Sequence, residues 1–163
     1  MSGIITIEPL TAEAFAPFGQ VIETEGAHHF PINNGMTERF HDLARVQLAG
    51  ENSRPLISIF RGQPYRLPLP LSLVERHPLG SQAFYPLSAH PWLVIVAEDQ
   101  DCEPVRLRAF EPRPGQGVNI AINTWHGVLT PLEQNGDFLV VDRGGDGQNL
   151  EEHRFHQSWT ITR

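Results

Sequence analysis

The sequence contains no lysine, and arginine supplies all 12 basic residues of the 163-residue chain. Covalent catalysis through a lysine Schiff base is therefore excluded. An anionic substrate would have to be held by arginine, by backbone N–H groups or by a metal, and the arginine fork suits a carboxylate. The net charge of −7 argues against nucleic acid or an anionic membrane as a partner, because both require a basic face.

Cysteine and long apolar runs are also scarce. The single cysteine, Cys102, excludes an internal disulfide framework and a cysteine-rich zinc site. No apolar run approaches the roughly 20 residues that a helix needs to span a bilayer. The N-terminus lacks the basic-then-apolar pattern of a signal peptide. We therefore expect a cytoplasmic protein without a membrane partner.

Turn-forming residues are abundant, with 14 glycines and 14 prolines spread along the chain. So many turn-forming residues leave little room for long helices and favour short strands joined by turns. Thr11 can cap one brief helix over residues 12–15, which Pro17 ends. The balance of 40% hydrophobic and 19% charged residues is ordinary for a globular protein. We expect a single domain over residues 1–163.

Strand patterns dominate the rest of the chain. Short apolar runs cover residues 56–60, 93–97 and 138–141, and residues 118–122 alternate between apolar and small or polar side chains. Such runs, separated by turn residues, are typical of a sandwich or barrel. The predicted fold class is mainly β with one or two short helices.

Polar side chains with acid–base or metal-binding chemistry gather beside these runs. Glu75 and His77 are two residues apart, so on a strand they point to the same face, and Gln82 returns after a Pro-Leu-Gly turn. His126 follows about 50 residues later, directly after Trp125. The pattern resembles the two motifs of cupins, and a barrel would bring these four side chains into one mouth. They offer nitrogen and oxygen ligands for a borderline divalent metal.

Other polar residues are candidates for substrate binding. Arg61 and Arg143 each end an apolar strand before a glycine, and either could hold a carboxylate. Asn33, Arg39 and His41 belong to a dense polar group over residues 32–43 that suits the rim of a site. Structural roles compete with these assignments, because arginines also brace loops or a dimer seam.

The two histidine-containing segments have structural alternatives as well. His77 precedes Pro78 and could be a turn residue, and His126 could bond a backbone carbonyl at the edge of the core. Glu75 could pair with Arg76 or with another surface arginine in an exposed ion pair of little energetic value.

Six blocks of the sequence resemble, in order, those of the ureidoglycolate lyase family. They lie within residues 4–145 and comprise Ile32–Gly35, Glu38–Ala44, Ile57–Pro64, Glu75–Phe84, Gly117–Asn119 with Trp125-His126, and Asp137–Gly145. The tail after Gln148 carries no recognised feature of this family. The resemblance implies a cupin-like double-stranded β-helix (jelly-roll) barrel, often a homodimer, that cleaves (S)-ureidoglycolate to glyoxylate and urea in allantoin degradation.

The resemblance also implies roles for particular residues. Glu75, His77 and His126 would act as acid and base, and Glu75, His77, Gln82 and His126 would hold a divalent metal. Nickel is preferred over zinc or manganese, and no organic cofactor is expected. Two alternatives are a non-catalytic cupin-like domain that binds a small carboxylate and another cupin enzyme acting on a sugar acid.

Overall fold

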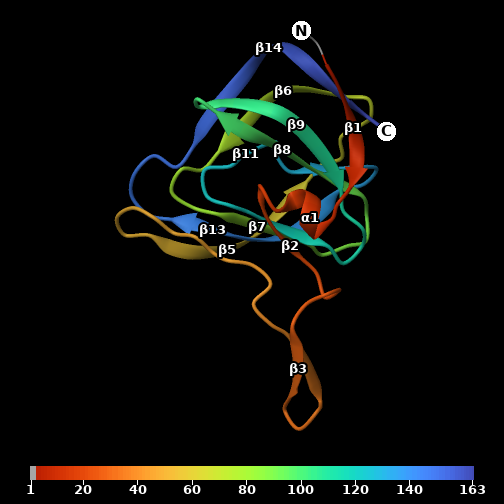
Figure 1. The fold of residues 1–163 in the computed structure, drawn as a ribbon, viewed down its shortest axis with the longest axis vertical. Helices are drawn as coiled ribbons and strands as arrows, with labels where there is room; N and C mark the ends of the chain where they lie inside the picture. The colour runs from red at the N-terminus through yellow and green to blue at the C-terminus, as the bar shows by residue number, and fades with distance from the viewer. Residues whose placement is uncertain (1–2) are drawn as a thin grey trace.

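The computed structural model describes residues 3–163, and nearly all of its regular structure is β (Figure 1). The elements in chain order are β1 (Ile4–Pro9), α1 (Ala12–Phe15), β2 (Gly19–Ile22), β3 (His29–Ile32), β4 (Thr37–Phe40), β5 (Arg54–Gly62), β6 (Leu69–Arg76), β7 (Gln82–Pro86), β8 (Trp92–Gln100), β9 (Glu103–Glu111), β10 (Gly117–Ile120), β11 (Trp125–His126), β12 (Thr130–Pro131), β13 (Gly136–Gly144) and β14 (Glu151–Thr162).

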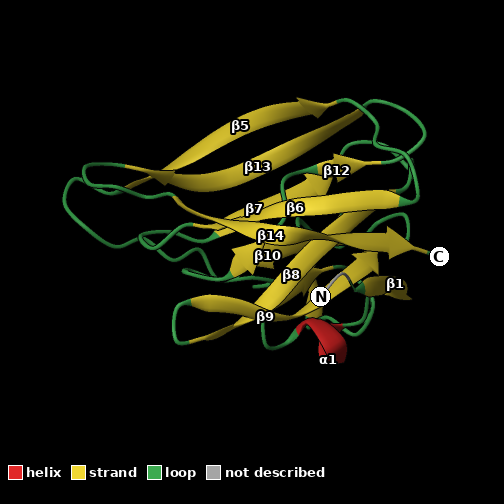
Figure 2. Cartoon of the chain, turned by 90° about the horizontal axis from the view of Figure 1, so that it is seen from above, coloured by secondary structure: helices red, strands yellow, loops and turns green. Residues whose placement is uncertain are grey.

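Two large sheets make up the body of the molecule (Figure 2). The seven-stranded sheet has the order β11-β6-β14-β1-β9-β8-β12, and an additional pairing of β11 with β8 closes its first six strands into a ring. The five-stranded sheet has the order β2-β10-β7-β13-β5. This mainly β, cupin-like barrel confirms the predicted fold class.

The short helix α1 also confirms its prediction. The Thr11 side chain accepts a hydrogen bond from the Ala14 backbone N–H at 3.1 Å, which satisfies one of the free donors of the first turn. Only four residues, Ala12–Phe15, are helical before Pro17. In the described part of the chain, no helix is long and apolar enough to cross a membrane.

The apolar run over residues 93–97 lies on strand β8, and the position of β8 explains why this run is continuous rather than alternating. Trp92, Val94 and Val96 pack into the core between the two sheets, with side chains from β7, β10 and β13. Leu93 and Ile95 face the other way, into a second core formed by the strands of the closed ring. A strand buried on both faces requires apolar residues at successive positions.

The strand expected over residues 118–122 is shorter and more buried than its alternating pattern predicted. Strand β10 ends at Ile120, so Ile122 lies outside it. Asn119, a polar residue of the alternating pattern, is 1% exposed. Its side-chain amide donates to the backbone oxygen of Arg45 at 2.7 Å, so the segment around Arg45 covers this face of the sheet.

Strands β3 and β4 form a hairpin that projects away from the body (Figure 1). Its tip contains Asn33 and Asn34 with φ angles of 54° and 56°, followed by Gly35 at 83°. Asparagine and glycine tolerate this left-handed conformation better than other residues do, which explains the Asn-Asn-Gly turn.

Candidate acid–base and metal site

Glu75 and His126 are direct cross-strand partners in the pairing of β6 with β11. The His126 Nε2 atom lies 3.7 Å from Glu75 Oε1. His77 follows the end of β6, and its ring centroid is 5.0 Å from that of His126. One ligand atom from each of the three residues lies within 4.8 Å of the others. Segments about 50 residues apart in the chain therefore meet at one place. We call Glu75, His77 and His126 the triad.

The triad faces the core between the two sheets. His126 also pairs with Val96 of β8, and directly opposite residues of neighbouring strands point to the same side. Val96 belongs to the core between the sheets, so Glu75 and His126 are directed there as well. His126 is 2% exposed, whereas the Glu75 side chain is 22% exposed. Glu75 is therefore the more accessible of these two residues.

Backbone carbonyls determine the tautomer of both histidines. His77 Nδ1 lies 2.8 Å from the Asn149 carbonyl oxygen, and His126 Nδ1 lies 2.9 Å from that of Thr124. A carbonyl oxygen only accepts hydrogen bonds, so Nδ1 carries the proton in each neutral ring. Each Nε2 then has a free lone pair, and both Nε2 atoms are buried without a hydrogen-bond partner.

The surroundings shift the acid–base properties of two triad members. Burial lowers the pKa of His126 to about 4, although the Thr124 carbonyl opposes this shift. Burial raises the pKa of Glu75, and His77 acts in the opposite direction. His126 is therefore neutral at neutral pH, and its 3.7 Å contact with Glu75 is not an ion pair. Instead, a nitrogen lone pair and a carboxylate face each other.

These residues fit a divalent metal. Two buried imidazole nitrogens with free lone pairs and one carboxylate form the two-histidine, one-carboxylate donor set that binds transition metals. The carbonyl bonds to both Nδ1 atoms are the outer interactions that orient metal-binding histidines. Glu75, His77 and His126 could thus hold a cation, which would polarise a bound hydroxyl group.

Gln82, the fourth predicted ligand, is buried on β7 of the five-stranded sheet. Its side-chain amide donates to Asp142 Oδ2 at 3.3 Å. The structure thus gives Gln82 a polar partner of its own across the β7–β13 pairing. A role as metal ligand stays a prediction.

The two predicted carboxylate-binding arginines lie in different environments. Arg61 is on β5, its side chain is 73% exposed, and it forms a two-pronged ion pair with Asp137 on β13 at 2.8 and 3.0 Å. Arg143 is 7% exposed. It donates to the backbone oxygens of Ala49 and Asp146, each at 2.7 Å, and so braces two loops.

The other predicted binding residues belong to the projecting hairpin. Asn33 is at its tip, and its amide donates to the Thr37 hydroxyl at 3.3 Å. Arg39 is exposed on β4, and His41 follows that strand. The ring of His41 packs against Phe30, with centroids 5.5 Å apart. Within one chain, the structure therefore places these residues on the hairpin and not on the strands of the triad.

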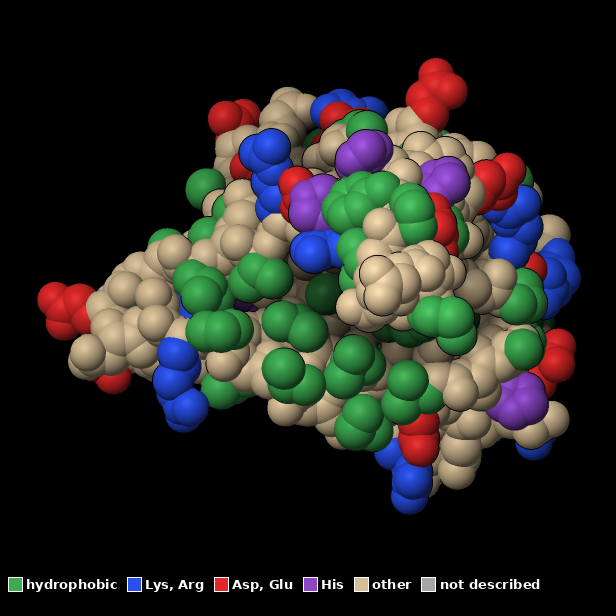
Figure 3. Space-filling view, turned by 90° about the horizontal axis from the view of Figure 1, so that it is seen from below, with side chains coloured by type: hydrophobic (Ala, Val, Ile, Leu, Met, Phe, Trp, Pro, Cys, Tyr) green, Lys and Arg blue, Asp and Glu red, His purple; other side chains and the backbone are tan. Residues whose placement is uncertain are grey.

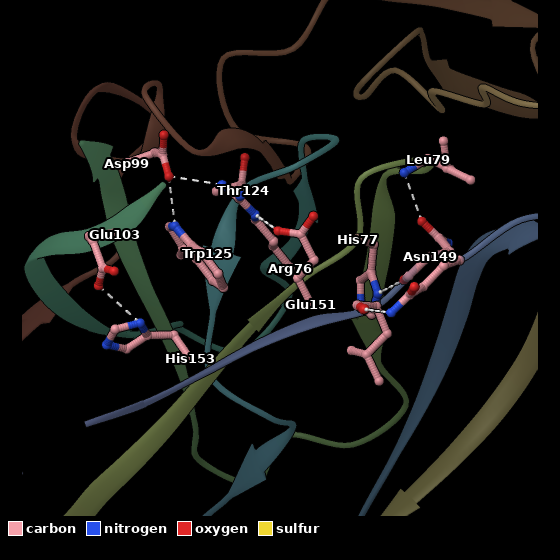
Figure 4. Close-up of polar contacts among 12 residues, drawn as sticks. Arg76, His77, Leu79, Asp99, Glu103, Thr124, Trp125, Asn149, Glu151 and His153 are labelled. Atoms are coloured by element: carbon pink, nitrogen blue, oxygen red, sulfur yellow. Dashed lines mark hydrogen bonds and ion pairs between the residues drawn. The ribbon is translucent and has the colours of Figure 1, made fainter. Parts of the chain in front are cut away.

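The C-terminal tail contains residues that sequence reasoning missed. Asn149 orients His77 through its backbone oxygen, and its side chain accepts a hydrogen bond from the Leu79 N–H at 2.7 Å (Figure 4). Glu151 begins β14 and binds Arg76. In the sequence, Trp159 and Ile161 alternate with polar residues, which is typical of a strand but indicates no link to the site.

Comparison with known proteins identifies the family of this chain. The family model described as ureidoglycolate lyase matches residues 2–162, which includes the tail beyond the previously recognised residues 4–145. A ureidoglycolate lyase of Chelativorans sp. (strain BNC1) is 62% identical over 157 residues, covering 96% of this chain and 95% of that protein. A ureidoglycolate lyase of Mesorhizobium japonicum is 58% identical and ureidoglycolate lyase 2 of Rhizobium meliloti is 55% identical, each covering 96% of both chains. The chain belongs to the ureidoglycolate lyase family.

Proposed function

We propose that this chain is a single-domain, cytoplasmic ureidoglycolate lyase that cleaves (S)-ureidoglycolate to glyoxylate and urea in allantoin degradation. The family match over residues 2–162 supports this reaction. The observation that carries the proposal is the triad, in which a carboxylate of raised pKa faces two imidazole nitrogens with free lone pairs. Such groups supply the proton transfers that this cleavage requires.

The chemistry of the substrate defines those transfers. One carbon of ureidoglycolate carries a hydroxyl, a carboxylate and a ureido nitrogen. Cleavage removes the hydroxyl proton, and the O–H electron pair becomes the new C=O bond of glyoxylate. The C–N bond breaks, its electron pair moves to the ureido nitrogen, and that nitrogen takes up a proton to leave as urea. The reaction is therefore a proton relay with no net gain or loss of protons.

Glu75 is suited to both ends of this relay. In the absence of a cation on Glu75, its raised pKa makes the carboxylate a better proton acceptor than an ordinary one, and it is more accessible than His126. The same carboxyl group can then return the proton to the departing nitrogen. His77 and His126 have free Nε2 lone pairs, so they accept and orient rather than donate at those atoms.

We propose that Arg143, rather than Arg61, binds the carboxylate of the substrate. Arg61 is already neutralised by Asp137, whereas the bonds of Arg143 go to neutral carbonyl oxygens. Gly80, three residues after His77, packs against the Arg143 side chain: a Cβ at Gly80 would lie 2.5 Å from Arg143 Cβ. Arg143 is thus adjacent to the loop that carries His77.

The reaction itself provides the direct test. Incubation of the protein with racemic ureidoglycolate should release urea and glyoxylate in equal amounts and consume half of the substrate. Urea can be measured with urease after the reaction is stopped, and glyoxylate as its phenylhydrazone. Release of ammonia and CO2 in place of intact urea would assign an amidohydrolase and overturn the lyase proposal.

We also propose that the protein is a homodimer. Ile57 and Ile59 on the outer face of β5 are 77% and 55% exposed, and Leu139 on the adjacent β13 is 37% exposed. Hydrophobic side chains gather on the face seen from the end of the hairpin (Figure 3). The hairpin itself carries Met36, which is 85% exposed. A two-stranded hairpin is only marginally stable alone, so a second copy of the chain is the partner that would cover both features.

Disrupting this face should separate the subunits. The double substitution Ile57→Glu with Ile59→Glu is expected to weaken association by about 30-fold or more, since each change puts a charge into an apolar contact. Light scattering after gel filtration should give twice the 18.3 kDa chain mass for the wild type and the single-chain mass for the variant. Ile4→Glu is the matched control, because Ile4 is 74% exposed on β1 of the other sheet. A monomeric wild type would contradict the proposal.

A further inference from the structure

A buried arginine lies directly behind the triad. Arg76 is between Glu75 and His77 in the sequence, so on β6 its side chain points to the opposite face from Glu75. It is 6% exposed. Its Nε donates to Glu151 Oε2 at 2.6 Å, and its Nη1 donates to Asp99 Oδ1 at 2.8 Å. The alternative that Arg76 pairs with Glu75 is therefore wrong.

The same arginine is stacked on the residue that precedes His126. The guanidinium carbon of Arg76 lies 4.2 Å from the centroid of the Trp125 ring. The Trp125 indole Nε1 donates to Asp99 Oδ1 at 2.8 Å, so one carboxylate oxygen binds both Arg76 and Trp125 (Figure 4). Arg76, Asp99, Trp125 and Glu151 thus form one connected unit, which we call the Arg76 clamp.

The clamp connects the strands whose neighbouring residues form the triad. Trp125 is on β11, Asp99 on β8 and Glu151 on β14, and all of these strands lie in the seven-stranded sheet with β6. Strand β11 has only two residues and a single register pair with β6, His126 with Glu75. Backbone pairing alone therefore gives β11 little support against β6. Side chains on the reverse face supply the additional connection.

We infer that Arg76 is a positioning residue, which holds β6 and β11 together from behind so that Glu75, His77 and His126 converge. This inference deepens the proposed function and rests on it. Stacking of the planar guanidinium on Trp125 together with two carboxylate bonds specifies both the separation and the angle of the two strands. Arg76 acts through the triad and does not itself contact the reacting atoms.

The chain offers a matched control in Arg108. Its guanidinium carbon lies 4.8 Å from the centroid of the Phe110 ring, and its Nε and Nη2 donate to the Glu8 carboxylate at 2.9 and 2.8 Å. Arg108 makes the same kinds of contact, but between β9 and β1. Arg76→Met removes these interactions behind the triad, and Arg108→Met removes similar ones on β9, where Val96 of β8 separates Arg108 from His126. The Arg108 side chain is also more exposed, at 33% against 7% for Arg76. Asp99 and Glu151 keep side chains that are 44% and 46% exposed, so water can solvate them in the Arg76 variant.

The expected result is a selective loss in Arg76→Met. Its kcat on ureidoglycolate should fall about 100-fold with KM changed less than about threefold, as a small misplacement of catalytic groups predicts. Its affinity for Zn²⁺, measured against a chromophoric chelator, should fall about 10- to 100-fold. Arg108→Met should lower the melting temperature but keep kcat and Zn²⁺ affinity within about twofold of the wild type. Equal effects of the two variants would overturn the inference.

Two further outcomes are informative. If Arg76→Met does not fold, Trp125→Phe provides a second test. This variant keeps an aromatic ring under Arg76 but removes the hydrogen bond to Asp99, so it should still lower kcat and Zn²⁺ affinity several-fold. Unchanged values would overturn the inference. If the wild type lacks lyase activity, the proposed function fails, and the Zn²⁺ comparison still tests the clamp. A wild type with neither activity nor Zn²⁺ affinity would overturn both.

Discussion

Replacing Glu75 by glutamine is expected to lower kcat by about 100- to 10,000-fold, the usual range for loss of a general acid–base group. Glutamine matches the size of glutamate but can neither accept the hydroxyl proton nor return it to the ureido nitrogen. The variant should keep its fold, because Glu75 is only partly buried and its strand pairs along its length with β14. Initial rates of glyoxylate formation at saturating substrate give the comparison.

The same substitution should make the protein more stable at neutral pH. Burial raises the pKa of Glu75 above its ordinary value of 4.5, so the folded chain holds this proton more tightly than the unfolded chain does. The stabilisation that results is present below pH 4.5 and is lost as the pH rises through the folded pKa. In chelator at pH 8, Glu75→Gln should therefore unfold at a higher urea concentration than the wild type. The difference should shrink towards pH 4.

Glu103→Gln is the control for loss of a carboxylate elsewhere. Glu103 contacts His153 at 3.1 Å and its side chain is 64% exposed, so this change should leave both kcat and the urea midpoint nearly unaltered. If the Glu103 and Glu75 variants have similar activity, the proton relay does not run through Glu75.

The barrel and the meeting of the triad could be predicted because local patterns determine them. The apolar run 93–97 requires a strand buried on both faces, and Thr11 before Ala12 specifies the short helix. The spacing of Glu75 and His77 brings them together: Glu75 lies near the end of β6, and His77 directly follows that strand. His126 joins them because short strands joined by turns close into a barrel, which brings distant segments together.

The supporting residues could not be predicted, because their partners are remote in sequence and chemically ordinary. Arginine is usually a surface residue, so the sequence does not indicate that Arg76 is buried. Its burial results from the pairing of β6 with β11 and β14. Asn149 binds His77 through a backbone oxygen, which no side-chain pattern reveals. The tail that carries Asn149 and Glu151 has no recognised family feature in the sequence, yet Glu151–Thr162 is the longest strand described.

Removal of bound metal is expected to reduce lyase activity by at least about 100-fold, which corresponds to losing about 2.7 kcal/mol or more of charge stabilisation. The physical reason is electrostatic repulsion. The Nε2 lone pairs of His77 and His126 face the Glu75 carboxylate, and these groups repel one another unless a cation or a proton lies between them. Protein purified without an affinity tag should be dialysed against a chelator, analysed for metal content and assayed. We expect Ni²⁺ to restore activity better than Zn²⁺ or Mn²⁺.

A variant of one buried ligand distinguishes this site from adventitious metal binding. His126→Asn removes the Nε2 atom of a side chain that is only 2% exposed, so activity should stay low after metal is added back. His28→Asn is the matched control, because His28 is exposed before the hairpin and its loss should leave restoration by metal intact. Full activity of wild-type protein whose metal content is below detection would contradict the metal assignment. In that case the burial of His126 and its pKa of about 4 would indicate a neutral hydrogen-bond acceptor for the substrate.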